Sequence, residues 1–480
     1  MYEVNVRRPL LEYLSAREVE ELHCASLEIL ERTGLNVHHP EARRLLQEAG
    51  AWVEGKGPRV RLPAGLVKQA LARAPERVVI ANRLGERVMP LEGAKSFFGT
   101  GSDLIRTIAL DTGQVRPSVL QDVAAAARLC DALPNYDFIM SYGLASDVPV
   151  HRQEVAQFVA MLRNTVKPLI VTTFTDLQAL EDIWAIACLV AGGEQEFQRN
   201  PFFILYGQFT SPLQHGVEAL QRLLFCAQRR IPLIYVPTIM SGMSGPIDMP
   251  GSLALGNAEA LAGLTIHQLA NPGAPFIYGG CICAFDMRHM SLAYGAPEWH
   301  VTGAMMSQLA RYYRLPIFST GGCTDAKLVD EQAGVEAAMS LLLAALGGGN
   351  LIHDVGYLET GLCGSPEFLV ITDEIVALTR QMLRNYTIDA RSLALSTINR
   401  VGPAGQFVGE EDTLRRCREA TWYPSLFDRS PRHEWAARGG QRLGEVARQR
   451  ARELLATHQP VPLEPAVDRQ IEAVLAAAGH

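Results

Sequence analysis

Short apolar runs rich in β-branched and aromatic residues alternate with amphipathic helical patterns along the middle of the chain. From residue 96 onward eight such runs occur, and each is followed by a segment with helical spacing. The runs occupy residues 96–100, 136–142, 168–174, 201–207, 232–238, 274–280, 316–322 and 350–356. The helical patterns lie near residues 118–132, 151–165, 176–191, 214–228, 254–271, 296–313, 329–346 and 369–385. Runs that are apolar throughout are typical of parallel strands buried on both faces.

This succession predicts an α/β fold in which residues 96–385 form a (β/α)8 TIM barrel. An open doubly wound sheet is the alternative. Residues 1–95 are expected to form a mixed α/β extension, and residues 386–480 a helical region. In the extension we expect a helix capped by Ser15 and Glu18, a helix after Pro40, a hairpin at 51–63, a helix from Pro63 to Arg73 and a strand at 76–83. In the C-terminal region we expect helices at 409–421 and 433–458, then a linker at 460–465 before a last helix.

The charge balance argues against nucleic acid as a partner. The chain has 44 basic and 51 acidic side chains, a net charge of -7, and no run of lysines or arginines. No stretch resembles a signal peptide, and none approaches the ~20 apolar residues that span a bilayer. Nine scattered cysteines fit reduced thiols. We therefore expect a soluble cytoplasmic enzyme that does not act at a membrane.

In a barrel the chemistry is expected just past each strand. Glycines cluster there, either for tight turns or for close approach of a large group. So do aromatic side chains, whose faces attract cations, although each could instead pack beneath the helices. The aromatic candidates are Tyr142, Phe174, Tyr206, Phe209, Tyr278, Trp299 and Tyr357. The carboxylates Asp103, Asp286, Asp325, Asp354 and Glu359 are candidate acid–base or orienting groups, with capping as the alternative.

Cysteines follow three neighbouring strands and leave a metal-dependent interpretation open. Cys281, Cys323 and Cys363 would be the ligands of a zinc-dependent methyltransferase. The chain has no CxxC pair, however, and Cys281-x-Cys283 is a weak signal, so we expect no bound metal.

Several blocks together resemble the trimethylamine methyltransferase family of corrinoid-dependent enzymes. They are FFGTGSD (97–103), DTGQVRPSVLQDVAAAARLCDALPN (111–135), GGCTDAKLVDEQAGVEA (321–337) and NLIHDVGYLETGLCGSPEFLVITDEI (350–375). The N-terminal stretch 30–53 and the C-terminal helices fit as well, so the resemblance covers essentially the whole chain. It implies a barrel that passes a methyl group from an amine to Co(I) of a separate corrinoid protein, with no tightly bound cofactor of its own.

Trimethylamine-specific members of that family carry pyrrolysine near the end of strand 7. This chain has ordinary residues there, with Gly322 the favoured equivalent within Gly321–Cys323. A quaternary ammonium leaves as a neutral amine and needs no such activating residue. The resemblance therefore implies a betaine-type quaternary amine:corrinoid methyltransferase, similar to glycine betaine methyltransferases, and a homo-oligomer. The alternative outside catalysis is a betaine-binding or corrinoid-docking subunit.

On this interpretation the candidate residues take separate roles. The catalytic group comprises Asp325, Glu359 and Gly322. The substrate-binding group comprises the cage Tyr142, Phe174, Tyr206, Tyr278 and Tyr357, with Gly321, Gly322, His353 and Arg288 as donors to a betaine carboxylate. Gly99, Gly101, Asp103 and Gly280 would let the corrin face approach.

Overall fold

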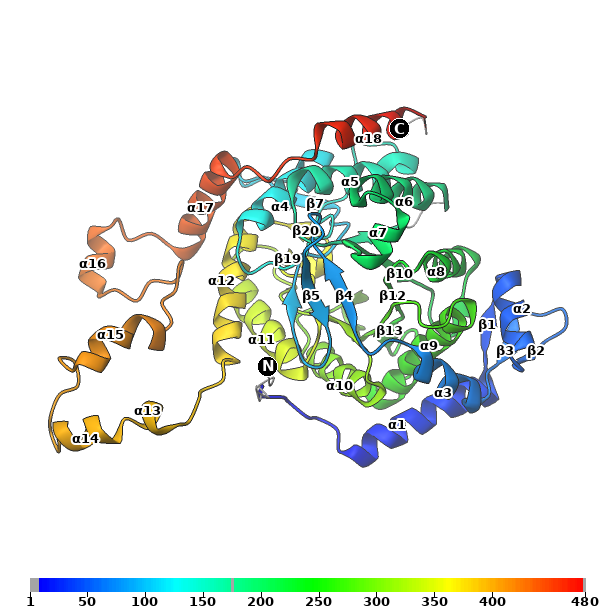
Figure 1. Cartoon of the computed structure of the whole chain (residues 1–480), viewed down its shortest axis with the longest axis horizontal. Helices are drawn as coiled ribbons and strands as arrows, with labels where there is room; N and C mark the ends of the chain where they lie inside the picture. The colour runs from blue at the N-terminus through cyan, green and yellow to red at the C-terminus, as the bar shows by residue number, and fades with distance from the viewer. Residues whose placement is uncertain (1–7, 174–176, 478–480) are drawn as a thin grey trace.

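A parallel sheet forms the centre of the protein, seen in a computed structural model that describes residues 8–173 and 177–477 (Figure 1). Within these residues the sheet has seven strands in the order β6-β18-β17-β14-β12-β10-β9. They are β6 (Phe97–Phe98), β9 (Leu169–Thr172), β10 (Phe203–Gln208), β12 (Leu233–Val236), β14 (Phe276–Gly279), β17 (Ile317–Thr320) and β18 (Leu351–His353). Six lie within their expected apolar runs and β10 extends one residue beyond its run, so the α/β class and seven of the eight strands are confirmed.

The eighth expected strand, at 136–142, is not a regular strand. Phe138 forms one isolated parallel bridge to Gly99, and Ile139 forms one to Leu169. The segment therefore touches both edges of the sheet, but it does not extend the ladder. The prediction of a closed eight-stranded barrel is therefore wrong in one respect. The hydrogen-bonded sheet has seven strands, and it does not close into a barrel.

Helices surround the sheet on its outer face (Figure 1). They are α4 (Leu120–Ala132), α5 (Val150–Asn164), α6 (Leu177–Ala191), α8 (Val217–Arg229), α9 (Met249–Ala270), α10 (Pro297–Tyr313), α11 (Glu331–Gly347) and α12 (Pro366–Met382), with α7 (Glu194–Arg199) after α6. All eight expected helical patterns form helices. Local signals explain several starts: Asp330 caps α11, and Ser365 caps α12 directly before Pro366.

The N-terminal extension forms the expected elements, which are α1 (Ala16–Glu28), α2 (Pro40–Glu48), β2 (Trp52–Val53), β3 (Arg59–Arg61), α3 (Ala64–Arg73) and β4 (Val78–Ala81). It also contains three elements that the sequence did not predict: η1 (Ile29–Thr33), β1 (Leu35–Val37) and β5 (Arg87–Leu91). Ser15 and Glu18 form the predicted capping box. The β4–β5 hairpin contributes Val78, Ile80, Met89 and Leu91 to the apolar cluster inside the sheet. It covers the amino ends of the strands, because Ala81 N donates to Pro201 O just before β10. The open end is therefore the carboxyl end.

Two small sheets stand at that open end. One contains β13 (Thr238–Ser241), β15 (Cys281–Asp286) and β16 (Ser291–Leu292). The other contains β19 (Tyr357–Leu358), β20 (Cys363–Gly364), β7 (Arg106–Ile108) and β8 (Val115–Pro117), with η2 (Glu359–Gly361) between its first two strands. Elsewhere β11 (Gln214–His215) pairs with β1.

The C-terminal region is helical, as expected. Its helices are α13 (Ala390–Leu393), α14 (Leu395–Val401), α15 (Glu411–Ala420), α16 (Arg432–Ala437), α17 (Leu443–Thr457) and α18 (Pro465–Ala477). The single helix expected at 433–458 is instead two, because Gly439 and Gly440 take positive φ and break it. Helices α13 to α16 extend away from the body, whereas α17 returns to it (Figure 1). Over the described residues no helix combines the length and apolarity needed to cross a membrane.

Candidate active site

A cavity of about 240 Å³ lies at the carboxyl ends of the central strands. Two carboxylates and four aromatic rings line it: Asp103, Asp354, Tyr206, Tyr294, Trp299 and Tyr357. Its polar wall includes Ser102, Gln208, Thr238 and His353, and Cys281 lies among the remaining lining residues. The lining drawn from the described residues contains no lysine or arginine. The cavity is therefore aromatic and carries acidic groups without a strong base.

The two aspartates are held by neutral donors. Asp103 accepts hydrogen bonds from Thr172 Oγ1 (3.0 Å) and Ser141 Oγ (3.5 Å). Asp354 directly follows β18 and is 4% exposed. Burial raises the pKa of both carboxyls above their ordinary value. Both residues have positive φ, 64° and 69°, a conformation that aspartate tolerates better than most residues and that gathers at functional sites.

His353 is fixed by a backbone contact and lies beside Asp354. Its Nδ1 lies 2.7 Å from Ser319 O, and a carbonyl only accepts, so Nδ1 carries hydrogen. Its Nε2 lies 3.3 Å from Asp354 Oδ2. The imidazole and the Asp354 carboxyl therefore lie side by side at the edge of the cavity.

The aromatic side chains form one wall around the carboxylates. The Tyr206 ring centroid lies 5.4 Å from that of Phe318 and 6.5 Å from that of His353. The Tyr294 and Trp299 rings are 4.4 Å apart. Burial, with a further contribution from Asp354, raises the hydroxyl pKa of Tyr206, Tyr294 and Tyr357, so these rings stay neutral. Aromatic faces attract cations.

Asp325 supports this wall from behind. Its carboxylate accepts from the backbone N–H groups of Tyr294 (2.8 Å) and Gly295 (2.9 Å), and from Thr360 Oγ1 (2.9 Å). It does not line the cavity, so the structure places it as a positioning residue for Tyr294. Lys327 donates to the backbone oxygen of Asp325.

The structure separates the predicted aromatic cage. Tyr206 and Tyr357 line the cavity. Tyr142 lies outside it, since its hydroxyl donates to Gly356 O (3.0 Å) and accepts from Ser365 N (2.8 Å). Tyr278 points toward the outer helices, where its hydroxyl donates to Asn257 (2.7 Å) on α9. Phe174 lies outside the described residues.

The backbone donors expected for a betaine carboxylate are already used. Gly321 N donates to His353 O (3.0 Å), and Gly322 N donates to Ser340 Oγ (2.9 Å). A Cβ on Gly322 would lie 2.9 Å from Val355 Cα, and φ is +82° there, so no side chain fits without a shift. Arg288 is exposed on the loop between β15 and β16. The catalytic role of Gly322 stays a prediction.

The other expected residues lie around the cavity, not in it. Glu359 forms an ion pair with Arg106 (2.8 Å). A Cβ on Gly99 would collide with Phe138, and one on Gly280 would lie 3.0 Å from Met306 Cε. A Cβ on Gly101 would collide with Asp354 and Tyr357. Of the four residues expected to face a corrin, only Asp103 lines the cavity.

Sequence reasoning missed several lining residues, among them Gln208, Thr238 and Tyr294. Gln208 directly follows the expected run 201–207 and Thr238 ends the run 232–238, and Gln208 Nε2 donates to Thr238 Oγ1, but neither is aromatic or acidic. Tyr294 lies on the loop after β16, well past the end of the nearest expected run. The signal that could have found it is the aromatic pair with Trp299, which itself belonged to the aromatic set.

The strand-end cysteines do not assemble a metal site. Within the described residues, no three His, Cys, Asp or Glu side chains are arranged to hold a metal ion. Burial raises the thiol pKa of Cys281 to about 12 and of Cys363 to about 11. Because the thiolate is the ligand form, these environments oppose metal binding.

Fold and cavity together define a class: an α/β protein with an acidic, aromatic pocket at the carboxyl ends of its parallel strands. Comparison with known proteins then gives the family. The model of the trimethylamine methyltransferase (MTTB) family matches residues 1–478, so the chain belongs to that family.

Curated relatives agree over nearly full length. The trimethylamine methyltransferase of Methanosarcina barkeri is 32% identical over 477 residues, covering 97% of this chain and 94% of the relative. The glycine betaine methyltransferase of Desulfitobacterium hafniense is 31% identical, covering 98% of each. The crystal structure of the Methanosarcina barkeri monomethylamine methyltransferase shares the fold, with a TM-score of 0.51 at 12% identity, covering 91% of this chain and 87% of that one.

Proposed function

We propose that this protein transfers a methyl group from a betaine-type quaternary amine to Co(I) of a cognate corrinoid protein. The observation that carries the proposal is the pair Asp103 and Asp354, two desolvated carboxylates without a lysine or arginine partner among the described residues. A permanently charged ligand supplies the missing positive charge, and the faces of Tyr206 and Tyr357 add cation–π attraction. Membership of a methyltransferase family supports the reaction type.

The charge of the donor decides how easily the methyl group leaves. When the carbon–nitrogen bond of a quaternary ammonium breaks, its electron pair stays on nitrogen and a neutral amine departs without needing a proton. An unprotonated tertiary amine would have to depart as an anion. The residues of this chain therefore need only bind the cation, orient one methyl group and exclude water.

The cavity has the size of the amine, not of a corrin. Its volume of about 240 Å³ lies below the ~300–1,000 Å³ of sites for drug-sized ligands. A cavity of this size supports a corrinoid that is held by a partner and approaches from outside, where Co(I) would supply the nucleophilic electron pair. We infer no tightly bound cofactor in this chain.

The negative charges of Asp103 and Asp354 also restrict the chemical group that the substrate carries beyond its nitrogen atom. A betaine carboxylate has to point away from both aspartates, toward the neutral donors Gln208 and Thr238. A quaternary amine without a carboxylate, such as choline, avoids this repulsion and is the second candidate.

The test combines binding and transfer. Glycine betaine, choline and trimethylamine are each added to the protein with reduced corrinoid protein, and loss of Co(I) absorbance is followed. We expect turnover with a quaternary amine and none with trimethylamine. Binding of a quaternary amine without turnover would indicate the non-catalytic subunit instead. Stoichiometric zinc that is required for turnover would favour the metal alternative, and no binding of any quaternary amine would overturn the proposal.

A further inference from the structure

Two neutral hydrogen-bonding side chains line the same cavity as the aspartates. Gln208 is the last residue of β10, and Thr238 is the first residue of β13, two residues after β12 ends. Both line the cavity and are half-buried. Gln208 Nε2 donates to Thr238 Oγ1, so the two strand ends are joined through their side chains. We call these two residues the neutral pair, because they add polarity to the cavity without adding charge.

The order of the strands separates the neutral pair from the carboxylates. Asp354 follows β18 and Asp103 follows β6, and these two strands are neighbours in the sheet. The neutral pair belongs to the ends of β10 and β12, which are also neighbours. On one side β17 and β14 lie between β18 and β12, and on the other side segment 136–142 and β9 lie between β6 and β10. The charged and the neutral side chains thus come from different parts of the cavity wall.

The neutral pair can donate hydrogen bonds to a ligand. Because Thr238 Oγ1 accepts from Gln208, the hydroxyl hydrogen of Thr238 is not used in this contact. The second hydrogen of Gln208 Nε2 is not used in it either. A carboxylate has only acceptor oxygens, and these two donors match it. The amide oxygen of Gln208 can in addition accept from a hydroxyl.

The backbone at Gln208 is fixed by the residue that follows it. Successive strand residues point to opposite faces of a sheet, so Phe209 points outward where Gln208 points inward. Phe209 is buried and stacks on the rings of His215 and Tyr235, with centroids 4.3 Å and 4.6 Å away. His215 Nδ1 lies 3.0 Å from the Tyr235 hydroxyl, which ties these two rings to each other. A rotation that took Gln208 out of the cavity would break this stack.

A buried carboxylate on α9 holds the loop that follows Gln208. Glu259 accepts hydrogen bonds from Ser211 Oγ (2.7 Å) and from Leu213 N. It is fully buried, its described partners are neutral, and it does not line the cavity. Leu213 has a positive φ of 54°, a conformation that leucine rarely adopts, and the contact with Glu259 stabilises it. Glu259 therefore acts on the cavity only through the loop that begins at Gln208.

We propose that Gln208, together with Thr238, selects the substrate by the group that it carries beyond its nitrogen atom, and that Glu259 is a positioning residue for Gln208. The inference rests on the proposed function, which places a quaternary ammonium at Asp103 and Asp354. With the ammonium there, the neutral pair is the part of the wall that meets the other end of the substrate. The pair then favours a betaine over a quaternary cation that has no hydrogen-bonding group.

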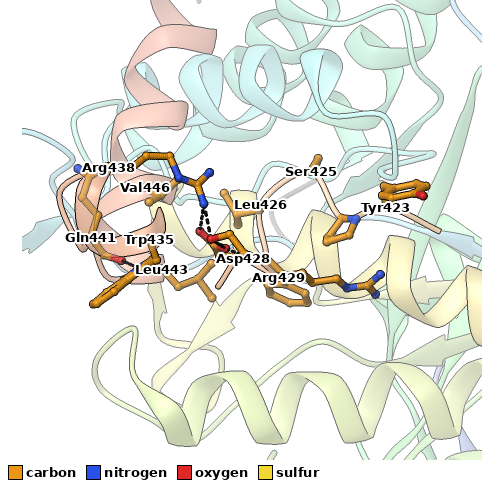
Figure 2. A pocket seen from close by; sticks show the side chains of 13 residues that line it. Tyr423, Ser425, Leu426, Asp428, Arg429, Trp435, Arg438, Gln441, Leu443 and Val446 are labelled. Atoms are coloured by element: carbon orange, nitrogen blue, oxygen red, sulfur yellow. Dashed lines mark hydrogen bonds and ion pairs between the residues drawn. The ribbon is translucent and has the colours of Figure 1, made fainter. Parts of the chain in front are cut away.

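A larger cavity elsewhere in the protein does not offer the same recognition. It has a volume of about 690 Å³ and lies where the C-terminal helices return to the body (Figure 2). Its Asp428 and Arg438 are 3.0 Å apart, and Figure 2 shows them paired with each other. Arg429 in its wall donates to Trp422 O (2.8 Å). The charges that a zwitterion would need there are already engaged, so we assign recognition of the betaine to the cavity at the strand ends.

Tetramethylammonium separates the two parts of the wall, because it carries the cation and no group beyond it. Calorimetric titration gives its affinity and that of glycine betaine, and the ratio of the two affinities measures the contribution of the neutral pair. We expect Gln208→Met to lower betaine affinity roughly tenfold, the loss of one hydrogen bond to a charged group, and to leave tetramethylammonium affinity unchanged. Gln208→Glu should weaken betaine further by repulsion and bind tetramethylammonium at least as tightly as the wild type. Thr238→Val should lower the ratio in the same direction.

The role of Glu259 is tested with the same ratio. Burial raises the pKa of Glu259 to about 7, so its uncharged form exists near neutral pH, and Glu259→Gln reproduces that form with both contacts kept. This variant should have the wild-type ratio. Glu259→Leu removes both contacts and should lower the ratio toward that of Gln208→Met. Ser211→Ala removes one contact and should lower the ratio by less, which tests the same point if the leucine variant does not fold.

Gln268→Met is the matched control. This buried glutamine lies on the same helix as Glu259, and it donates to Ala274 O (2.9 Å). Its loss should lower the melting temperature and keep the wild-type ratio of affinities. The control therefore separates selection of the substrate from general destabilisation of the fold.

The outcomes that would overturn the inference are specific. A wild-type ratio in Gln208→Met, or an equal loss of both ligands, would remove the selective role of Gln208. A wild-type ratio in both Glu259→Leu and Ser211→Ala would remove the positioning role of Glu259. Failure of the proposed function gives a different result. A wild type that binds neither cation would overturn both proposals, and one that binds both without methyl transfer would overturn the proposed function alone.

Discussion

The carboxylate of Asp354 occupies the space that a side chain on Gly101 would fill. A Cβ at Gly101 would collide with Asp354 Oδ1 and with the hydroxyl of Tyr357, which donates to Ser102 O. The glycine that follows β6 thus leaves room for Asp354 and Tyr357, two cavity residues that follow β18. The absent side chain is part of the geometry of the cavity.

Gly101→Ala should therefore displace Asp354 and Tyr357. We expect amine affinity to fall at least tenfold and the free energy of unfolding to fall by about 1–3 kcal/mol, as for an overpacked core. Gly303→Ala is the matched control. Nothing lies within 4 Å of that position on α10, so alanine should leave binding unchanged and slightly stabilise the helix. Calorimetric titration and thermal melts measure both; equal affinity in the two variants would contradict the argument.

Asp354→Asn should lower the affinity for the amine but raise the stability of the folded protein. Because the folded-state pKa of Asp354 is raised, its contribution to stability is present below the ordinary Asp value of ~3.9 and is lost as pH rises through the folded value. At neutral pH the variant without ligand should melt roughly 1–3 °C higher, the shift that about 1 kcal/mol gives in a large domain. Amine affinity should fall by at least tenfold. Asparagine also accepts the positive φ at this position.

Asp286→Asn is the control for this substitution. Asp286 is a carboxylate at the end of β15, paired with His289 (2.7 Å) and outside the cavity lining. It should bind amine as the wild type does. A loss of affinity as large as that of Asp354→Asn would show that general electrostatics, not the cavity, governs binding.

The pH dependence of binding follows from the same raised pKa values. Protonated Asp103 and Asp354 offer no charge to a quaternary ammonium, and the ligand itself does not titrate. Affinity should therefore rise with pH through the raised carboxyl values, which lie above ~3.9, and then reach a plateau. Calorimetric titrations across the acidic range measure the profile. In the double variant Asp103→Asn, Asp354→Asn the profile should be flat; a persisting rise would assign the titration to other groups.

The alternation of elements was predictable because each strand is a compact apolar run and each helix has its own spacing. The break at 136–142 was not. That run, YDFIMSY, contains Asp137, whose carboxylate accepts from Phe98 N (2.7 Å) and binds Arg380. These side-chain contacts replace part of the ladder, and they depend on residues far away in the chain.

The site was only partly predictable for a related reason. Strands that are apolar on both faces carry no period-2 signal, so the sequence could not tell that Tyr206 faces the cavity while Tyr278 faces α9. Asp354 was among the candidate carboxylates in the sequence. Its burial next to His353 could not be predicted, because that burial follows from the packing of β18. Asp325, by contrast, is an acidic residue at a strand end that does not line the cavity. Its carboxylate accepts hydrogen bonds from the loop that carries Tyr294.

That role of Asp325 leads to a positioning prediction. Asp325→Ala leaves the N–H groups of Tyr294 and Gly295 without their acceptor, so Tyr294 should lose its fixed place in the cavity wall. We expect affinity for the amine to fall about tenfold while its pH profile keeps the wild-type shape, because Asp325 does not face the ligand. Asp325→Asn retains one acceptor oxygen and should recover part of the affinity. A changed pH profile would instead give Asp325 a direct role.

The last prediction concerns the face of Tyr206. If its ring binds the cation, Tyr206→Phe should keep most of the affinity and Tyr206→Leu should lose about 0.5–2 kcal/mol of binding free energy, a factor of roughly 2–30. Tyr278→Phe is the matched control, since it removes the hydroxyl that donates to Asn257 and should cost about 1 kcal/mol of stability without changing affinity. Titration with glycine betaine and with choline measures all three. If the Tyr206→Leu variant binds either cation as tightly as the Tyr206→Phe variant does, the aromatic wall acts only by excluding water. The two aspartates alone would then bind the positive charge of the ligand.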